Sequence, residues 1–157
     1  MITFIDVGRQ ERMGTISKDF SFREFEASDI AARLRIDNAI KDWDVRDNIV
    51  ALVENVLQPL RDAWGGPIFI GPRHSGYRCP ELNSMVGGVK NSQHQTGEAA
   101  DCGVTDPFAL AKLLLSMNIE FDQLGLYPSF CHISYKRDGE NRREVFYAKT
   151  YKGPKLK

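Results

Sequence analysis

A stripe of apolar residues between positions 44 and 64 limits the possible folds more than any other feature of the sequence. Its members are Val45, Ile49, Leu52, Val53, Val56, Leu57, Leu60 and Trp64. Their spacings of three and four are the pattern of an amphipathic α-helix, which buries its apolar face against other elements. Pro59 is expected to kink this helix near its end, and Gly65 with Gly66 to stop it. The chain must therefore supply a core around one long helix.

The other predicted elements place helices first and strands last. Ser21 and Glu24 form a capping-box pattern for a short helix, residues 79–88 indicate a brief helix, and Asp106 with Pro107 begins a further amphipathic helix. Strands are predicted at 67–71, 98–104, 121–127, 130–136 and 144–151, with a polar turn at 137–143 joining the last two. Antiparallel strands that follow helices favour an α+β fold over a βαβ repeat.

Length and charge favour one soluble domain over residues 1–157. A chain of 157 residues with 42% apolar and 27% charged content can bury a core. The first 18 or so residues and the basic tail 151–157 are expected to be peripheral. Lysine plus arginine equals aspartate plus glutamate at 21 each, so composition predicts neither nucleic acid nor an anionic membrane as a partner. A monomer is favoured.

The N-terminus and the cysteines bear on the compartment. The opening residues lack the charged and apolar regions of a signal peptide, and no apolar run is long enough to insert into a membrane, so a cytoplasmic site of synthesis is expected. Cys79, Cys102 and Cys131 are odd in number and widely spaced, and they form no CxxC pair. Buried free thiols are expected. Strand alternation points Cys102 and Cys131 to the opposite face from their neighbours Asp101 and His132.

The stretch NSQHQTGEAAD, residues 91–101, places two metal-ligand types close together. His94 and Asp101 lie seven positions apart, and Gly97 between them allows a tight return of the backbone. Catalytic zinc sites use three such protein ligands and keep one position open. His132, in an apolar strand segment, is the best remaining third ligand. On spacing alone, a hydrogen-bonded structural histidine and a solvated carboxylate are the more common explanations.

Three segments together resemble the M15 zinc peptidases. SQHQTGEAAD matches the SxHxxGxAxD signature of that family, which includes D-Ala-D-Ala carboxypeptidases, dipeptidases and phage endolysins, and whose metal scaffold also occurs in hedgehog signalling domains. SGYRCPELNSMVGG and FDQLGLYPSFCHISY are similar to the segments that flank the signature. The resemblance covers roughly residues 19–136. It implies a hedgehog/DD-peptidase-like fold, with helices packed on a small, mainly antiparallel sheet that carries the metal site.

The resemblance also implies a role for individual residues. His94, Asp101 and His132 would hold one zinc ion, although manganese or another divalent ion stays open. Arg78 would bind a substrate carboxylate or stabilise the oxyanion in catalysis. Ser92 and Gln93 would bind substrate or hold the loop. The implied chemistry is attack on a peptide carbonyl by a metal-activated water.

The sequence departs from the family where a general base is expected. Better-studied relatives carry an acid a few residues before the last histidine, but positions 126–130 contain none, and Ser134 stands where some relatives have aspartate. Asp122 is the nearest upstream acid and is our candidate for the catalytic base; a structural carboxylate is an equal alternative. Glu98 is either a second candidate base or a solvated carboxylate. His74 is expected to be a surface histidine, with a role in the cleft as general acid or stabiliser as the alternative.

The function implied is hydrolysis of peptidoglycan stem peptides, by a D,D-carboxypeptidase or an endolysin-like endopeptidase. A small domain without a signal peptide suits a phage or prophage protein that acts on the cell wall after release. The alternative is a non-catalytic zinc-containing module of the same fold that binds cell wall or a protein partner. The positions without an acid before His132 favour that alternative, whereas Arg78 and the complete ligand set favour the enzyme.

Overall fold

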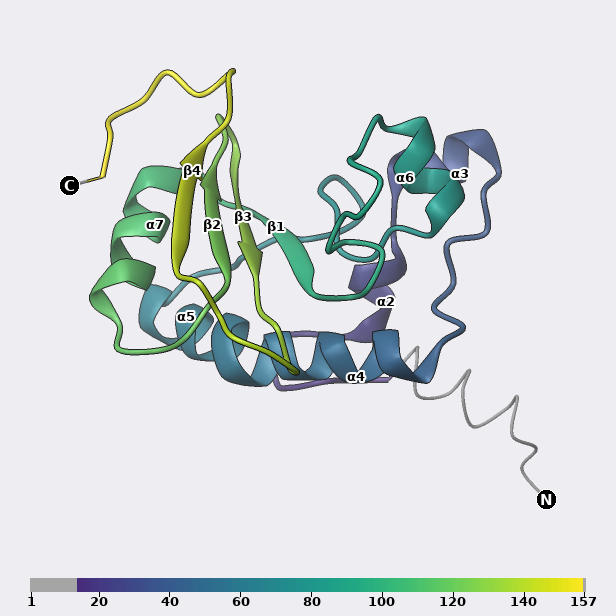
Figure 1. Cartoon of the computed structure of the whole chain (residues 1–157), viewed down its shortest axis with the longest axis horizontal. Helices are drawn as coiled ribbons and strands as arrows, with labels where there is room; N and C mark the ends of the chain where they lie inside the picture. Colours follow the sequence, from purple (N-terminus) through teal and green to yellow (C-terminus); the bar gives the residue numbers. More distant parts are fainter. Residues whose placement is uncertain (1–13, 157) are drawn as a thin grey trace.

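Seven helical segments and one small sheet make up the computed structural model, which describes residues 14–156 (Figure 1). The helical segments are α2 (Phe22–Glu26), α3 (Asp29–Leu34), α4 (Trp43–Leu52), the π-helix η1 (Val53–Leu57), α5 (Gln58–Trp64), α6 (Pro80–Met85) and α7 (Pro107–Ser116). The strands are β1 (Ala99–Gly103), β2 (Gln123–Leu126), β3 (Phe130–Ser134) and β4 (Glu144–Tyr147). The predicted α+β class is confirmed. The predicted peripheral N-terminus falls largely on residues 1–13, outside the described part of the chain.

The predicted long helix forms as α4, η1 and α5 in direct succession. Its apolar face is buried, with Ile49, Leu52 and Leu60 all at 0% exposure. Pro59 lies in α5, directly after the widened turn η1, in which the N–H of Gln58 reaches back to the carbonyl of Val53. The expected kink at Pro59 stays a prediction. Proline cannot donate a hydrogen bond, and its ring needs extra room in a helix, which a π-turn just before it provides. The helix ends as predicted at Gly65, which adopts the left-handed conformation (φ 76°).

The sheet has the strand order β1-β3-β2-β4. Both neighbours of β3 run antiparallel to it, whereas β4 runs parallel to β2. Residues 137–143 are thus a crossover past β2, not a turn that joins two paired strands. The strand predicted at 67–71 is also wrong, because it forms a single bridge, Phe69 to Gly103. The N–H of Gly71 then bonds to the Glu24 carbonyl and takes the chain away from the sheet.

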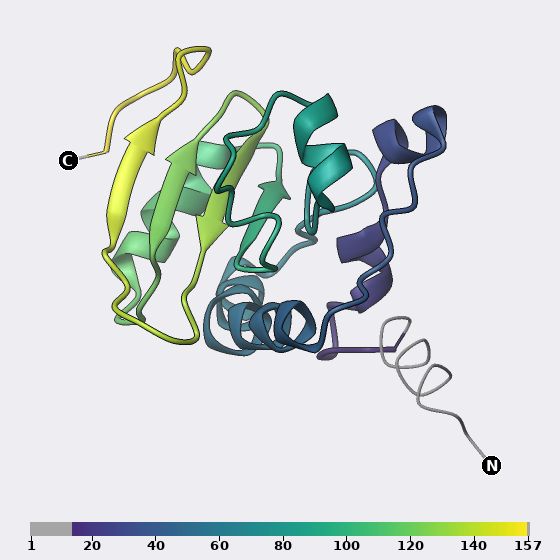
Figure 2. The same cartoon turned by 45° about the vertical axis from the view of Figure 1, so that its right-hand side comes forward.

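Helix α7 covers one face of the sheet and leaves the other face to the site (Figure 2). Leu124, Leu126 and Ile133 are fully buried in the core. Cys131 is buried as well, and its thiol donates to the Pro107 carbonyl at the start of α7 (3.1 Å). Cys102, its partner on β1, is also a free buried thiol. The expectation that these thiols lie behind the site is confirmed.

Two short helices and one asparagine hold the segment before α6. The predicted capping box at α2 is present, with Ser21 and Glu24 bonded to each other's backbone. Asn38, which is buried, donates to the carbonyls of Glu26 and Tyr77 (2.9 Å each) and accepts from the N–H of Cys79 (2.8 Å). These bonds fix the backbone on both sides of Arg78. Among residues 14–156, no helix is long and apolar enough to cross a membrane.

Candidate metal centre

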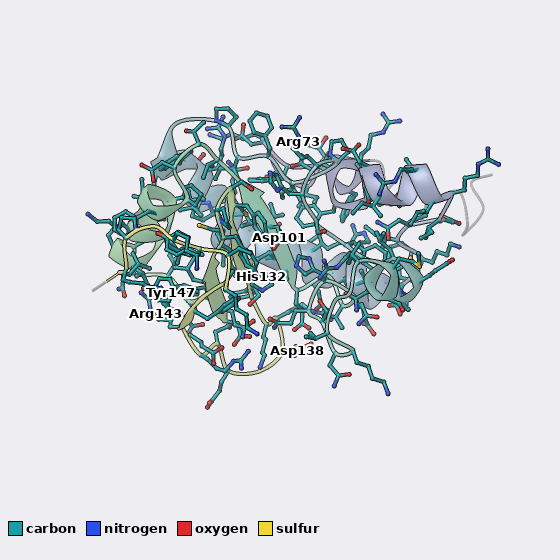
Figure 3. The ribbon with its side chains drawn as sticks, turned by 90° about the horizontal axis from the view of Figure 1, so that it is seen from above. Arg73, Asp101, His132, Asp138, Arg143 and Tyr147 are labelled. Atoms are coloured by element: carbon teal, nitrogen blue, oxygen red, sulfur yellow. The ribbon has the colours of Figure 1, made fainter. Side chains whose placement is uncertain are left out.

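Asp101 and His132 lie side by side on the face of the sheet that α7 leaves open (Figure 3). They are directly paired residues of the antiparallel strands β1 and β3, so their side chains point to the same face. His94 comes from the loop between α6 and β1 and completes a group of three. The structure thus brings together the three residues that the sequence predicts as ligands.

The ligand atoms of this group fit a zinc ion. Asp101 Oδ1 is 3.3 Å from His94 Nε2 and 3.1 Å from His132 Nδ1. All three ligand atoms lie within 4.8 Å of one another. Tetrahedral zinc with bonds of about 2.0–2.1 Å would separate neighbouring ligand atoms by about 3.3 Å. Two imidazoles and one carboxylate are also a donor set that zinc accepts in catalytic sites.

A backbone carbonyl orients the His94 ring. Nδ1 of His94 is 2.7 Å from the carbonyl oxygen of Gly76, which can only accept, so Nδ1 carries the proton. Nε2, on the side of the ring that faces Asp101, is then the nitrogen available to a metal ion. This arrangement, in which the second nitrogen of a ligand histidine is fixed by a carbonyl, is typical of metal sites.

Gly97 makes the predicted tight return between His94 and Asp101. Its φ is 78°, a conformation that favours glycine. A Cβ at this position would meet the Val45 carbonyl oxygen at 2.5 Å and Ile49 Cγ1 at 2.9 Å. The loop therefore lies directly on α4, and only glycine leaves room for it there.

The charge of Asp101 is stabilised by the two histidines. Burial by itself raises the pKa of this carboxyl, but the charges and hydrogen bonds of His94 and His132 outweigh it and hold the pKa well below its usual range. Asp101 is therefore ionised, as a metal ligand must be.

The group lies in a cleft of about 830 Å³. Arg78, Ser92 and Gln93 line it, as the sequence predicts for residues that contact substrate. Arg78 Nη2 donates to Ser92 Oγ (3.3 Å), but Nε of Arg78 is buried and has no hydrogen-bond partner within residues 14–156. Burial lowers the pKa of this guanidinium, with Asp101 opposing the shift. A buried donor without a partner, next to the metal ligands, is suited to an anionic group of a ligand.

Asp122, our sequence candidate for the base, lies beneath the cleft with its oxygens in use. It is fully buried and accepts from the N–H and Nε of Arg142 at Oδ1 and from Nη2 at Oδ2 (3.1, 2.9 and 2.8 Å). Gln93 Nε2 also donates to Oδ2 (3.0 Å). These contacts are those expected of a structural carboxylate, the alternative to a catalytic base at this position. A role as base stays a prediction.

The two remaining sequence candidates differ in their access to the cleft. Glu98 lines the cleft, and its carboxylate accepts from the Thr96 hydroxyl. His74 is not among the lining residues; its ring packs at 5.3 Å from the Phe130 ring, and burial lowers its pKa. Ser134, which replaces the aspartate of some relatives, is buried and accepts from the N–H of Gln123 (2.9 Å).

Several cleft residues were not predicted from the sequence. They are Gln123, Tyr127, Phe130, Lys136, Arg142, Glu144 and Phe146. Residues on the same face as His132 could have been found by alternation along β3, but Arg142, Glu144 and Phe146 depend on β4 pairing with β2. No local signal indicates that pairing.

Comparison with known proteins identifies the family of the chain. No curated protein matches the chain. A protein-family model described as Peptidase M15 matches residues 18–134, a span that holds the three grouped residues and Arg78 and stops before β4. The α+β fold with a small four-stranded sheet fits a peptidase of this type. With most of its length matched, the chain belongs to the Peptidase M15 family.

Proposed function

We propose that the protein is a zinc-dependent peptidase that hydrolyses peptidoglycan stem peptides, with His94, Asp101 and His132 as zinc ligands. The observation that carries the proposal is that these three residues converge in one cleft with Arg78, whose Nε has no hydrogen-bond partner among residues 14–156. His94, Asp101 and His132 would hold the zinc ion, which would supply Lewis acidity toward the scissile carbonyl and a water molecule. The family match supports the peptidase class, and the substrate is our inference from the sequence resemblance.

Arg78 is proposed to bind the C-terminal carboxylate of the substrate or its developing oxyanion. Its Nε has no hydrogen-bond partner among the described residues, and its Nη2 donates to Ser92 Oγ (3.3 Å). A free C-terminal carboxylate would make the enzyme a D,D-carboxypeptidase. An oxyanion role would equally serve an endopeptidase that cuts within the stem peptide.

Gln93 is proposed to accept a hydrogen bond from a substrate N–H. Its Nε2 donates to Asp122, and because a carboxylate only accepts, the amide is held with Oε1 directed away from that contact. Oε1 is buried and has no partner within residues 14–156. Such an acceptor is stabilised when a ligand N–H reaches it. Asp122 would thus act as a positioning residue for Gln93.

Glu98 is proposed as the group that takes up the proton of the attacking water. Apart from Asp101, the carboxylates that line the cleft in the described part of the chain are Glu98 and Glu144. Glu98 lies within the signature segment and directly precedes β1, whereas Glu144 lies outside that segment on β4 and accepts from Gln123 (2.8 Å). Access to the cleft favours Glu98 over the buried Asp122.

The test is mass spectrometry of peptidoglycan fragments after incubation with zinc-loaded protein. Asp101→Ala removes a ligand, and Asp138→Ala, on a side chain that is 86% exposed, is the matched control. We expect products from the wild type and the control only. Loss of one terminal alanine would identify a carboxypeptidase, and shorter peptides an endopeptidase. An unchanged digest by zinc-bound protein would contradict the proposal and favour the non-catalytic module.

A further inference from the structure

An aromatic residue of β4 lies directly beside the candidate metal ligands. Cross-strand pairing places Phe146, Gly125, His132 and Asp101 in one row across the sheet, on β4, β2, β3 and β1. Directly paired residues point to the same face, so this row forms part of the cleft surface. Asp101 and His132 belong to the matched family region, whereas Phe146 lies outside it. Nothing in the family match therefore assigns a role to Phe146.

Gly125 allows the Phe146 ring to reach the metal centre. A Cβ built on Gly125 would collide with three carbons of that ring, so the ring lies over the glycine. Its centroid is 5.7 Å from that of His132, at an interplanar angle of 53°. The ring thus occupies the space that a side chain at position 125 would fill, and it contacts the outer side of a ligand histidine.

Phe146 is part of the cleft wall and not of the core. Its neighbours on β4, Val145 and Tyr147, pack against the hydrophobic core, whereas Phe146 lines the cleft. It is half-buried, which leaves part of its surface open to a ligand. An apolar surface kept open beside a metal centre is suited to an apolar group of that ligand.

Two more rings extend this wall. Tyr127 meets Phe146 edge to face at 6.3 Å, and Phe130 stacks on Tyr127 at 4.4 Å. Hydrogen-bonding residues, among them Arg78, Ser92 and Gln93, also line the cleft. The cleft therefore combines groups that can bind a peptide backbone or carboxylate with an aromatic wall that can bind a side chain.

We propose that Phe146, with Tyr127 and Phe130, forms an apolar subsite that selects substrates with an uncharged aliphatic side chain next to the cleaved bond. This inference rests on the proposed peptidase function. Burial of each added carbon against such a wall should increase affinity about threefold to fourfold. A charged side chain would have to give up water against aromatic rings and should bind more weakly than its aliphatic counterpart.

The test uses Co²⁺-loaded protein and the N-acetylated hydroxamates of glycine, alanine, leucine and aspartate. These compounds share one chelating group and differ only in the side chain. Titration followed by the visible Co²⁺ spectrum measures binding without any hydrolysis. For the wild type we expect affinity to rise from glycine through alanine to leucine, and aspartate to bind at least about tenfold more weakly than leucine.

Three variants locate the effect. Phe146→Ala removes the ring, and Gly125→Ala displaces it because the new Cβ would overlap the ring. In both variants the increase in affinity from the glycine to the leucine hydroxamate should fall to less than about twofold per carbon. Phe69→Ala, an aromatic residue that is 62% exposed and absent from the cleft lining, should leave the series unchanged. The ratio between hydroxamates cancels any change in metal affinity. If Phe146→Ala fails to fold, Gly125→Ala and the wild-type series still decide the question.

The outcomes separate the two proposals. A wild type that binds all four hydroxamates equally, or a Phe146→Ala variant that keeps the full gain, would overturn the subsite and leave the peptidase proposal standing. Wild-type protein that binds no Co²⁺ would overturn the metal site, and the subsite with it. If hydroxamate affinity rises with side-chain size and depends on Phe146, but the protein cleaves no peptidoglycan, the subsite would stand and its ligand would not be a peptidoglycan peptide.

Discussion

Replacing Asp122 with asparagine tests whether this carboxylate is a structural charge beneath the cleft. The side chain is fully buried and receives hydrogen bonds from Arg142 and Gln93. Asparagine has nearly the same shape, so the substitution removes the negative charge without leaving a cavity. It also turns one acceptor into a donor that faces the donors of Arg142.

The pKa of Asp122 gives the size of the expected effect. Burial raises this pKa, but the hydrogen bonds and charge of Arg142, with Gln93, outweigh it and lower the pKa from 3.8 to about 2. The difference corresponds to about 2 kcal/mol of folding free energy at pH 7. Because the folded-state pKa is the lower one, this stabilisation is fully present above about pH 5 and is lost as the pH falls through about 2. About half of it should remain at pH 3.

Urea unfolding followed by circular dichroism, in EDTA at pH 7 and pH 3, measures this effect. Asp122→Asn should lower the free energy of unfolding by about 2 kcal/mol at pH 7 and by about half as much at pH 3. Glu144→Gln is the matched control: it removes an exposed carboxylate 3.7 Å from Arg142, and its effect should stay below about 1 kcal/mol. An equal loss at both pH values, or none at pH 7, would refute the electrostatic explanation.

Three further outcomes are expected. Asp101→Ala should weaken zinc binding at least about 100-fold in competition with a chromogenic chelator, because it removes one of three ligands and leaves two imidazoles. Unchanged affinity would place the metal elsewhere. Gly97→Ala should destabilise the fold by about 3 kcal/mol or more, and the control Gly65→Ala by about 1 kcal/mol. Both glycines have positive φ, but only Gly97 is pressed against Val45 and Ile49. Equal losses of stability in thermal unfolding would argue against that contact. A thiol-specific chromogenic disulfide should react with Cys79 in the native protein and with all three cysteines only in urea. The reason is that Cys102 and Cys131 are buried, and burial raises the pKa of Cys131 to about 12. Rapid reaction of a second thiol in the native protein would contradict this.

Features that depend on local sequence were predictable. The apolar spacing of residues 44–64, the capping box at Ser21 and the start of α7 at Pro107 each result from interactions within a few residues. The metal group was predictable for a related reason: its residues occur in a recognisable signature and on a strand whose alternation fixes their direction.

Features that depend on distant partners were not predictable. Alternation along residues 144–147 indicates which side chains share a face, but it does not reveal that β4 pairs with β2 in place of β3. The cleft wall at Phe146 was missed for that reason. The partners of Asp122 were missed too, because Arg142 reaches it from twenty positions along the chain only after that crossover. Likewise, η1 reflects how the helix accommodates Pro59 between buried faces, which residue spacing does not show.

The strand order has a consequence for self-association. It leaves β1 and β4 at the two edges of the sheet, and an open edge can add a strand from another chain. The outer side of β1 is occupied, since the N–H of Asp101 donates to the Ser75 carbonyl and Phe69 bridges to Gly103. β4 is only four residues long, with Arg142 and Arg143 before it and Lys149 soon after. A second molecule that docked its own β4 edge to edge would bring these like charges together, so the sheet resists growth into aggregates from either side.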